Sequence, residues 1–103
     1  MKSKFFSLII VLSLIVFLFV RAQKKEETNY VPNEETAIRI AEAIWLPIYG
    51  DRIYSEKPFV ATFKKKTNTW IVEGSLPPNS SGGVALIEIR KSDCKILRVK
   101  HGK

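Results

Sequence analysis

The side chains that could act as a nucleophile and its general base are the single cysteine, Cys94, and the single histidine, His101. A catalytic pair of this kind needs hydrogen-bond contact, at about 3 Å. The two residues fall at opposite ends of a predicted strand, and seven residues of strand span about 20 Å. This spacing argues against a Cys-His dyad within one chain, and we expect no enzymatic activity.

The sequence also lacks the spacing of a metal or cofactor site. One histidine and one cysteine cannot fill a site of three or four ligands. Gly82-Gly83 lacks the lysine and the strand-to-helix context of a phosphate loop, so a turn is its simpler reading. Cys94 can form no intrachain disulfide. We therefore predict no metal and no cofactor.

Five side chains remain as candidates for contact with a protein partner. Tyr49 and Tyr54 follow a predicted helix in an irregular segment, where we expect them to be exposed. Glu73 and Glu88 fall on strands, where they either face a basic partner or form ordinary cross-strand pairs. His101 lies near the end of the last strand and either contacts a partner or is satisfied by backbone or water.

A helix is predicted from Glu34 to about Leu46, with Asn33 as its N-cap. Pro47 should stop or kink it, because proline disfavours helical geometry in the residue before it. At about 100° per residue, the apolar side chains form one stripe that must pack against another element. The stripe consists of Ala37, Ile40, Ala41, Ile44, Trp45 and Ile48, with Ile38 at its edge.

After Pro58 the apolar period changes to two, which indicates strands. Residues 59–64 and 70–76 form a predicted hairpin, whose turn carries Lys64-Lys65-Lys66 as solvated charges. Residues 77–83 are rich in proline, serine and glycine and form a loop. Two further strands are predicted over 84–91 and 95–101. One helix and four antiparallel strands make an α+β domain.

The last hairpin can be registered by placing its apolar side chains on one face. A three-residue loop, Ser92-Asp93-Cys94, achieves this and puts Cys94 in the left-handed position that glycine normally takes. The predicted pairs are Ile89 with Leu97, Ile87 with Val99, and Glu88 with Arg98 on the outer face.

The N-terminus has the pattern of a secretory signal peptide. Lys2 and Lys4 precede an uncharged, mostly apolar run from Phe5 to Val20, and Ala22 offers a cleavage site. We predict a signal peptide over 1–22, or an uncleaved anchor, then a polar tether over 23–32 and the domain over 33–103. N-terminal lysines tend to stay cytoplasmic, so the domain should be exported, either periplasmic or held at the envelope.

Charge argues against nucleic-acid binding. The whole chain of 103 residues has a net charge of +7, but three of its 17 basic residues lie in the first 22. The remainder is mildly basic, whereas nucleic-acid binders concentrate basic residues on one face. We expect membrane contact only through the N-terminal segment, if it is uncleaved.

Several short stretches together resemble the NTF2-fold immunity proteins of bacterial polymorphic toxin systems. They are Glu42-Ala43-Ile44-Trp45-Leu46-Pro47-Ile48-Tyr49-Gly50, Lys57-Pro58-Phe59, Trp70-Ile71-Val72-Glu73-Gly74, Gly82-Gly83-Val84, Ile87-Glu88-Ile89 and His101-Gly102. The resemblance covers about 32–103 and departs at Cys94, where that family usually carries glycine. It implies a curved cystatin-like or NTF2-like sheet cradling a helix, and a non-enzymatic protein that binds and neutralises a cognate toxin by occlusion.

Two alternatives stay open at this point. A regulatory or peptidase-inhibitory envelope module of the PepSY type is also a helix with antiparallel strands, and the stretch 92–97 is similar to its last turn and strand. A small-ligand or enzymatic use of a cone-shaped pocket would need polar groups that converge in a deep cavity. The sequence supplies few inward-facing polar residues for that purpose.

Overall fold

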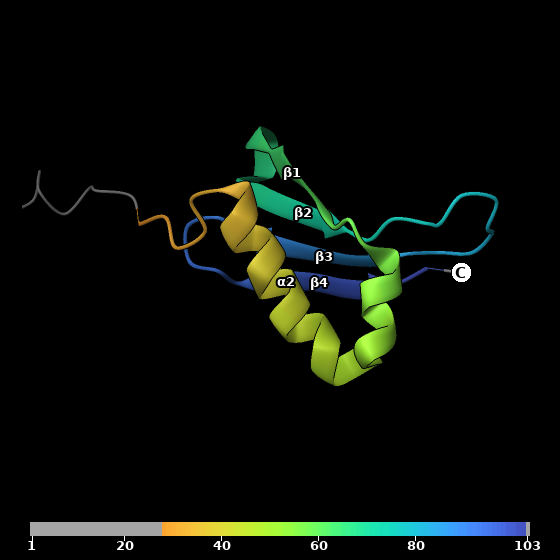
Figure 1. Ribbon diagram of the computed structural model, residues 1–103. Coiled ribbons are helices and arrows are strands. Elements are labelled where there is room, and N and C mark those ends of the chain that lie inside the picture. The colour runs from red at the N-terminus through yellow and green to blue at the C-terminus, as the bar shows by residue number, and fades with distance from the viewer. Residues whose placement is uncertain (1–27, 103) are drawn as a thin grey trace, which may run out of the picture.

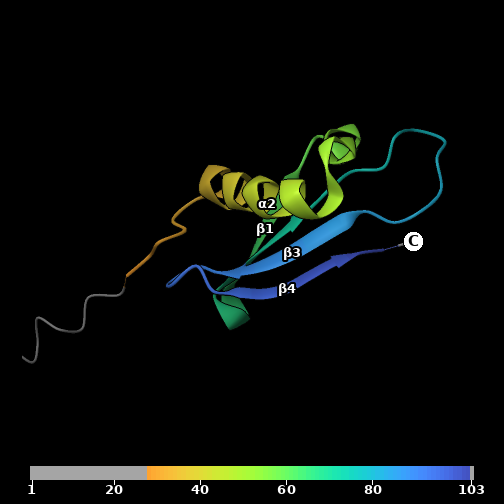
Figure 2. The ribbon, with the colours of Figure 1, turned by 90° about the horizontal axis from the view of Figure 1, so that it is seen from below.

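The computed structural model describes residues 28–102, so the predicted signal segment and residues 23–27 of the tether lie outside the described chain. One helix lies across one face of a four-stranded antiparallel sheet (Figures 1 and 2). No helix within 28–102 is both long and apolar enough to cross a membrane. The elements are α2 (Glu34–Tyr49), the 3-10 helix η1 (Asp51–Glu56), β1 (Val60–Lys64), the 3-10 turn η2 (Lys65–Thr67), β2 (Thr69–Glu73), β3 (Ala85–Arg90) and β4 (Ile96–His101).

The start of α2 follows from its cap. The Asn33 side chain accepts a hydrogen bond from the Thr36 backbone N–H at 2.9 Å, as a predicted N-cap should. The prediction for the other end is wrong by one turn, because the helix passes through Pro47 and ends at Tyr49. The Gly50 N–H, at a φ of 75°, donates to the Leu46 carbonyl at 2.8 Å and closes this last turn beyond the proline.

The apolar stripe of α2 packs as predicted along most of its length. Ala37, Ala41 and Trp45 are fully buried, and the isoleucines beside them pack against the same core. Ile48 is the exception, since it is 56% exposed. It belongs to the last turn of α2, which extends beyond the edge of the sheet (Figure 1).

The strands pair in the order β1-β2-β3-β4. The two hairpins are those that the sequence predicts, and the structure joins them through β2 and β3. Alternation places one set of side chains beneath α2 and the other on the open face of the sheet. Facing pairs under the helix are Phe63 with Trp70, Ala61 with Val72, Val72 with Ile87, and Ile87 with Val99.

The last hairpin confirms part of the predicted register and corrects the rest. Ile87 pairs with Val99 and Glu88 with Arg98, but Ile89 pairs with Ile96 across a bulge. Leu97 is the extra residue of the bulge and is 44% exposed, so its predicted burial is wrong.

The loop explains this shift. It has four residues, 91–94, instead of three, because the Arg90 N–H donates to the Lys95 carbonyl at 2.9 Å. Asp93 accepts from the Arg90 guanidinium and from the Lys95 N–H, which holds the longer turn closed. Cys94 has a φ of 62°, so its predicted left-handed position is confirmed.

The chain joins the fold before the helix begins. The N–H groups of Tyr30 and Val31 donate to the carbonyls of Ser92 and Lys91, at 3.2 and 3.1 Å. The Trp70 indole N–H donates to the Val31 carbonyl at 2.8 Å, and Val31 is fully buried. Residues 30 and 31, assigned from sequence to the tether, are therefore packed parts of the domain.

We expect Val31→Ala to lower the free energy of unfolding by about 1–3 kcal/mol, because it removes two buried methyl groups and leaves a cavity. Tyr30→Ala, at a largely exposed neighbour, should change it by no more than about 0.5 kcal/mol. Urea denaturation of the two variants measures both. Equal effects would contradict the anchoring of this segment through Val31.

Candidate binding site

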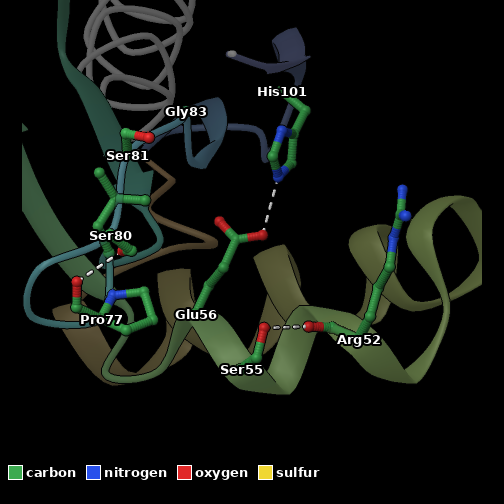
Figure 3. Close-up of a pocket in the computed structure, with 9 residues that line it drawn as sticks. Arg52, Ser55, Glu56, Pro77, Ser80, Ser81, Gly83 and His101 are labelled. Carbon is green, nitrogen blue, oxygen red and sulfur yellow. Dashed lines mark hydrogen bonds and ion pairs between the residues drawn. The ribbon is translucent and has the colours of Figure 1, made fainter.

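An open pocket of about 350 Å³ lies where η1, the loop before β3 and the end of β4 meet (Figure 3). The turn at Gly50, after α2, brings η1 to this end of the sheet. The Ile53 side chain of η1 is buried in the core. The lining residues come from all three segments: Arg52, Ser55, Glu56, Leu76, Pro77, Ser80, Ser81, Gly83 and His101.

Glu56 is the residue that holds these segments together. Its Oε1 atom accepts a hydrogen bond from the Ala85 N–H at 2.7 Å, at the start of β3. Its Oε2 atom accepts from His101 Nε2 at 2.8 Å, at the end of β4. Its backbone carbonyl accepts from the Ser75 N–H at 2.7 Å. The carboxylate, only 13% exposed, is thus fixed in one orientation.

Two glycines make room for this arrangement. A Cβ atom on Gly74 would lie 2.6 Å from Glu56 Oε1 and 2.9 Å from Glu56 Cβ, closer than side chains approach. A Cβ atom on Gly83 would overlap the backbone of Gly102. Both positions therefore require a residue without a side chain.

His101 faces an acceptor on each side of its ring. Nε2 meets the Glu56 carboxylate and Nδ1 meets the Gly102 carbonyl, both at 2.8 Å. Only the imidazolium donates from both nitrogens. The hydrogen bond to Glu56 accordingly raises the pKa of His101 above its ordinary value of 6.5, against the opposing effects of burial and of the Arg52 charge. The Tyr49 ring lies edge-on to the imidazole, with centroids 5.3 Å apart.

Arg52 brings a second basic side chain to the pocket. Its side chain rises from η1 on the same side as Glu56 (Figure 3). Among residues 28–102, no carboxylate lies within ion-pair distance of its guanidinium, whereas Glu56 is engaged by His101. The Ser55 and Ser80 hydroxyls donate to nearby backbone carbonyls. The pocket can therefore receive an anionic group, with Arg52 as the cation that pairs with it.

The five side chains predicted to contact a partner do not share one surface. Tyr49 and His101 touch each other beside the pocket, and Tyr54 is partly exposed on η1. Glu42 raises the pKa of the Tyr54 hydroxyl by hydrogen bonding. Glu73 and Glu88 lie on the opposite, open face of the sheet, where Glu88 pairs in register with Ile71 and Arg98.

His101 is satisfied mainly by a residue that the sequence analysis did not single out. Glu56 lies 45 positions earlier, so no local pattern links the two. Arg52 was also missed, because η1 has no apolar periodicity of its own from which its position could be predicted. The available cue was the placement of Gly74 and Gly83 beside strand ends, where backbone often approaches closely. Among the described residues, no group of three or more possible ligands could hold a metal ion.

The sequence of this domain matches one known protein family and two proteins of Escherichia coli. Residues 36–103 match the sequence model of the NTF2 fold immunity proteins. "Uncharacterized protein YhhH" of Escherichia coli K12 is 32% identical over 120 aligned residues, which cover 99% of this chain and 93% of that protein. "Uncharacterized protein YbbC" of the same strain is 40% identical over 77 residues, covering 73% of this chain and 62% of that protein. No solved structure gives a significant match.

The raised pKa of His101 predicts a pH-dependent stability. Its stabilisation is complete below the unfolded-state pKa of about 6.5 and is lost as the pH rises through the higher folded-state pKa. The free energy of unfolding, measured with urea across this range, should therefore fall as the pH rises above about 6.5. Because His101 is the single histidine, His101→Gln should flatten the slope. An unchanged slope in this variant would assign the dependence to other groups.

The close approach of Gly83 to Gly102 gives a matched pair of variants. Gly83→Ala should destabilise the domain by about 1–3 kcal/mol, because its Cβ atom meets backbone that cannot move aside cheaply. In Gly102→Ala the nearest atom to the new Cβ is 3.5 Å away, and we expect a change within about 0.5 kcal/mol. Equal stability of the two variants in chemical denaturation would refute the packing described here.

Proposed function

Because the chain belongs to the family of NTF2 fold immunity proteins, we propose that it is a non-enzymatic immunity protein that binds a cognate bacterial toxin and neutralises it by occlusion. The observation that carries the proposed binding site is the preformed pocket around Glu56, His101 and Arg52. Family membership favours this function over a PepSY-type module.

The pocket is suited to a protein partner. Seven of its nine lining residues are exposed, and Leu76 contributes an exposed apolar side chain at the rim. Small-molecule sites instead enclose most of their ligand. Protein interfaces combine an apolar core with a polar, solvent-accessible rim, and this open surface offers both kinds of side chain.

Rigidity supports the same conclusion. The hydrogen bonds from Ala85 and His101 fix the Glu56 carboxylate before any partner arrives. A surface that is already ordered loses less conformational entropy on association. Arg52 then supplies a cation for an acidic group on the toxin, and arginine is enriched among the residues that dominate binding energy. Tyr54, on the same 3-10 helix, offers an adjacent aromatic contact.

The export pattern at the N-terminus bears on where the toxin acts. If the domain is exported, as the sequence predicts, its toxin acts in the periplasm or at the envelope. The first experiment is purification of the tagged protein after co-expression with the products of neighbouring genes. Recovery of a stoichiometric complex with a toxin supports the proposal. If no stable protein partner is found under these conditions, the proposal is wrong.

Two sets of variants then locate the interface, because the candidate residues lie on opposite faces. Arg52→Ala should weaken binding of the co-purified toxin by about 30-fold, as expected for a dominant contact. Glu73→Gln and Glu88→Gln, on the open face of the sheet, should change it by no more than about threefold. Isothermal titration calorimetry measures the affinities, and growth of toxin-expressing cells reports protection. The reverse pattern would place the interface on the open face.

A further inference from the structure

A second surface lies at the other end of the sheet, away from the pocket. The turn between β1 and β2 and the loop between β3 and β4 are brought together there, because the Lys91 N–H donates to the Asn68 carbonyl at 2.9 Å. Figures 1 and 2 both show these two turns at the end where the chain enters the domain. We call this surface the basic end; its charged residues are Lys64, Lys65, Lys66, Arg90, Lys91, Asp93 and Lys95.

Charge is strongly divided between this end and the rest of the domain. The basic end has six basic residues and one acid, whereas the rest of residues 28–102 has five basic residues and seven acids. The single acid, Asp93, is already paired with Arg90 at 2.6 Å. Lys64, Lys65, Lys66 and Lys95 are exposed, and among the described residues none of them forms an ion pair.

Exposed apolar side chains accompany these lysines. Tyr30 is 64% exposed at the entry of the chain, and Ile96 and Leu97 are exposed immediately after Lys95. The bulge turns Leu97 out of the core. Lysines mixed with tyrosine and aliphatic side chains are the composition of surfaces that lie at a membrane interface, where the apolar groups enter the headgroup region and the cations meet anionic lipids.

The length of chain before the domain places this end near a membrane. The apolar run ends at Val20, and Tyr30 hydrogen-bonds to the loop of the basic end. The intervening residues can span no more than about 35 Å, even when fully extended. If the apolar run stays in the membrane as an anchor, the basic end is the part of the domain whose position the tether restricts most.

We propose that the basic end of the domain lies against an anionic lipid surface, with the N-terminal apolar segment inserted in the same membrane. One apolar segment and one polybasic patch are complementary signals, since the first sets the location and the second adds electrostatic attraction to anionic headgroups. This attraction acts within about one Debye length, roughly 8 Å at physiological salt, which the tether permits. This proposal departs from the expectation that only the N-terminal segment touches the membrane, and it does not depend on the toxin.

The test compares lysine reactivity in the full chain reconstituted into two kinds of vesicle. One contains phosphatidylcholine alone, and the other contains phosphatidylcholine and phosphatidylglycerol in equal parts. Acetylation by a water-soluble ester is followed for each lysine by mass spectrometry. Lys65, Lys66 and Lys95 should react about fivefold more slowly in the anionic vesicles, with Lys57 and Lys100 as unprotected internal references. About 1 M NaCl should abolish the difference.

Two matched double variants separate local contact from general charge. Lys65→Gln/Lys66→Gln should restore fast acetylation of Lys95 in anionic vesicles. Lys57→Gln/Lys100→Gln, which removes the same charge elsewhere, should leave Lys95 protected. Near-ultraviolet circular dichroism confirms that both variants are folded. Equal reactivity in the two vesicles would overturn the proposal, and so would protection that appears only when purified toxin is added, because the basic end would then be a protein interface.

Discussion

The burial of Trp45 between α2 and the sheet is the contact on which the rest of the domain depends. Its ring is fully buried and meets Phe59 edge-on, with centroids 5.1 Å apart. Burying an aromatic side chain of this size contributes about 4–6 kcal/mol. Within residues 28–102 its indole N–H has no hydrogen-bond partner, which costs about 1–3 kcal/mol. Packing therefore outweighs the lost hydrogen bond. Ala41 and Ala37, one and two turns earlier, let the helix approach the sheet closely enough for this contact.

The position of α2 in turn determines where the pocket forms. The helix ends at Tyr49 beyond the edge of the sheet, and the buried Ile53 returns the chain toward the core as η1. Only then does Glu56 reach the start of β3 and the end of β4, two segments that the sheet has already placed side by side. The site is thus assembled by long-range packing, and its polar contacts lock an arrangement that apolar burial creates.

The sequence predicts the parts of this fold that depend on periodicity and turn chemistry. The stripe of α2, the two antiparallel hairpins, the loop over 77–83 and the left-handed Cys94 all follow from local pattern. The bulge at Leu97 could not be predicted in this way, because a three-residue and a four-residue loop both bury Ile87 and Val99. The pairing of Glu56 with His101 was also out of reach, since no pattern relates residues so far apart in sequence. Val31 was misassigned because a single apolar residue in a polar stretch gives no period.

The two surfaces proposed for this domain lie at opposite ends of the same sheet, about one strand length, or roughly 20 Å, apart. Because the turns that carry the lysines and the residues that line the pocket are joined by the same rigid strands, contact at one end fixes the direction in which the other end points. With the basic end on a lipid surface, the pocket faces the aqueous side, where a toxin can reach Arg52 without competing with the membrane. The division of charge has the same consequence. The lysines of the basic end attract anionic headgroups, whereas the rest of the domain carries more acids than basic residues and is attracted less.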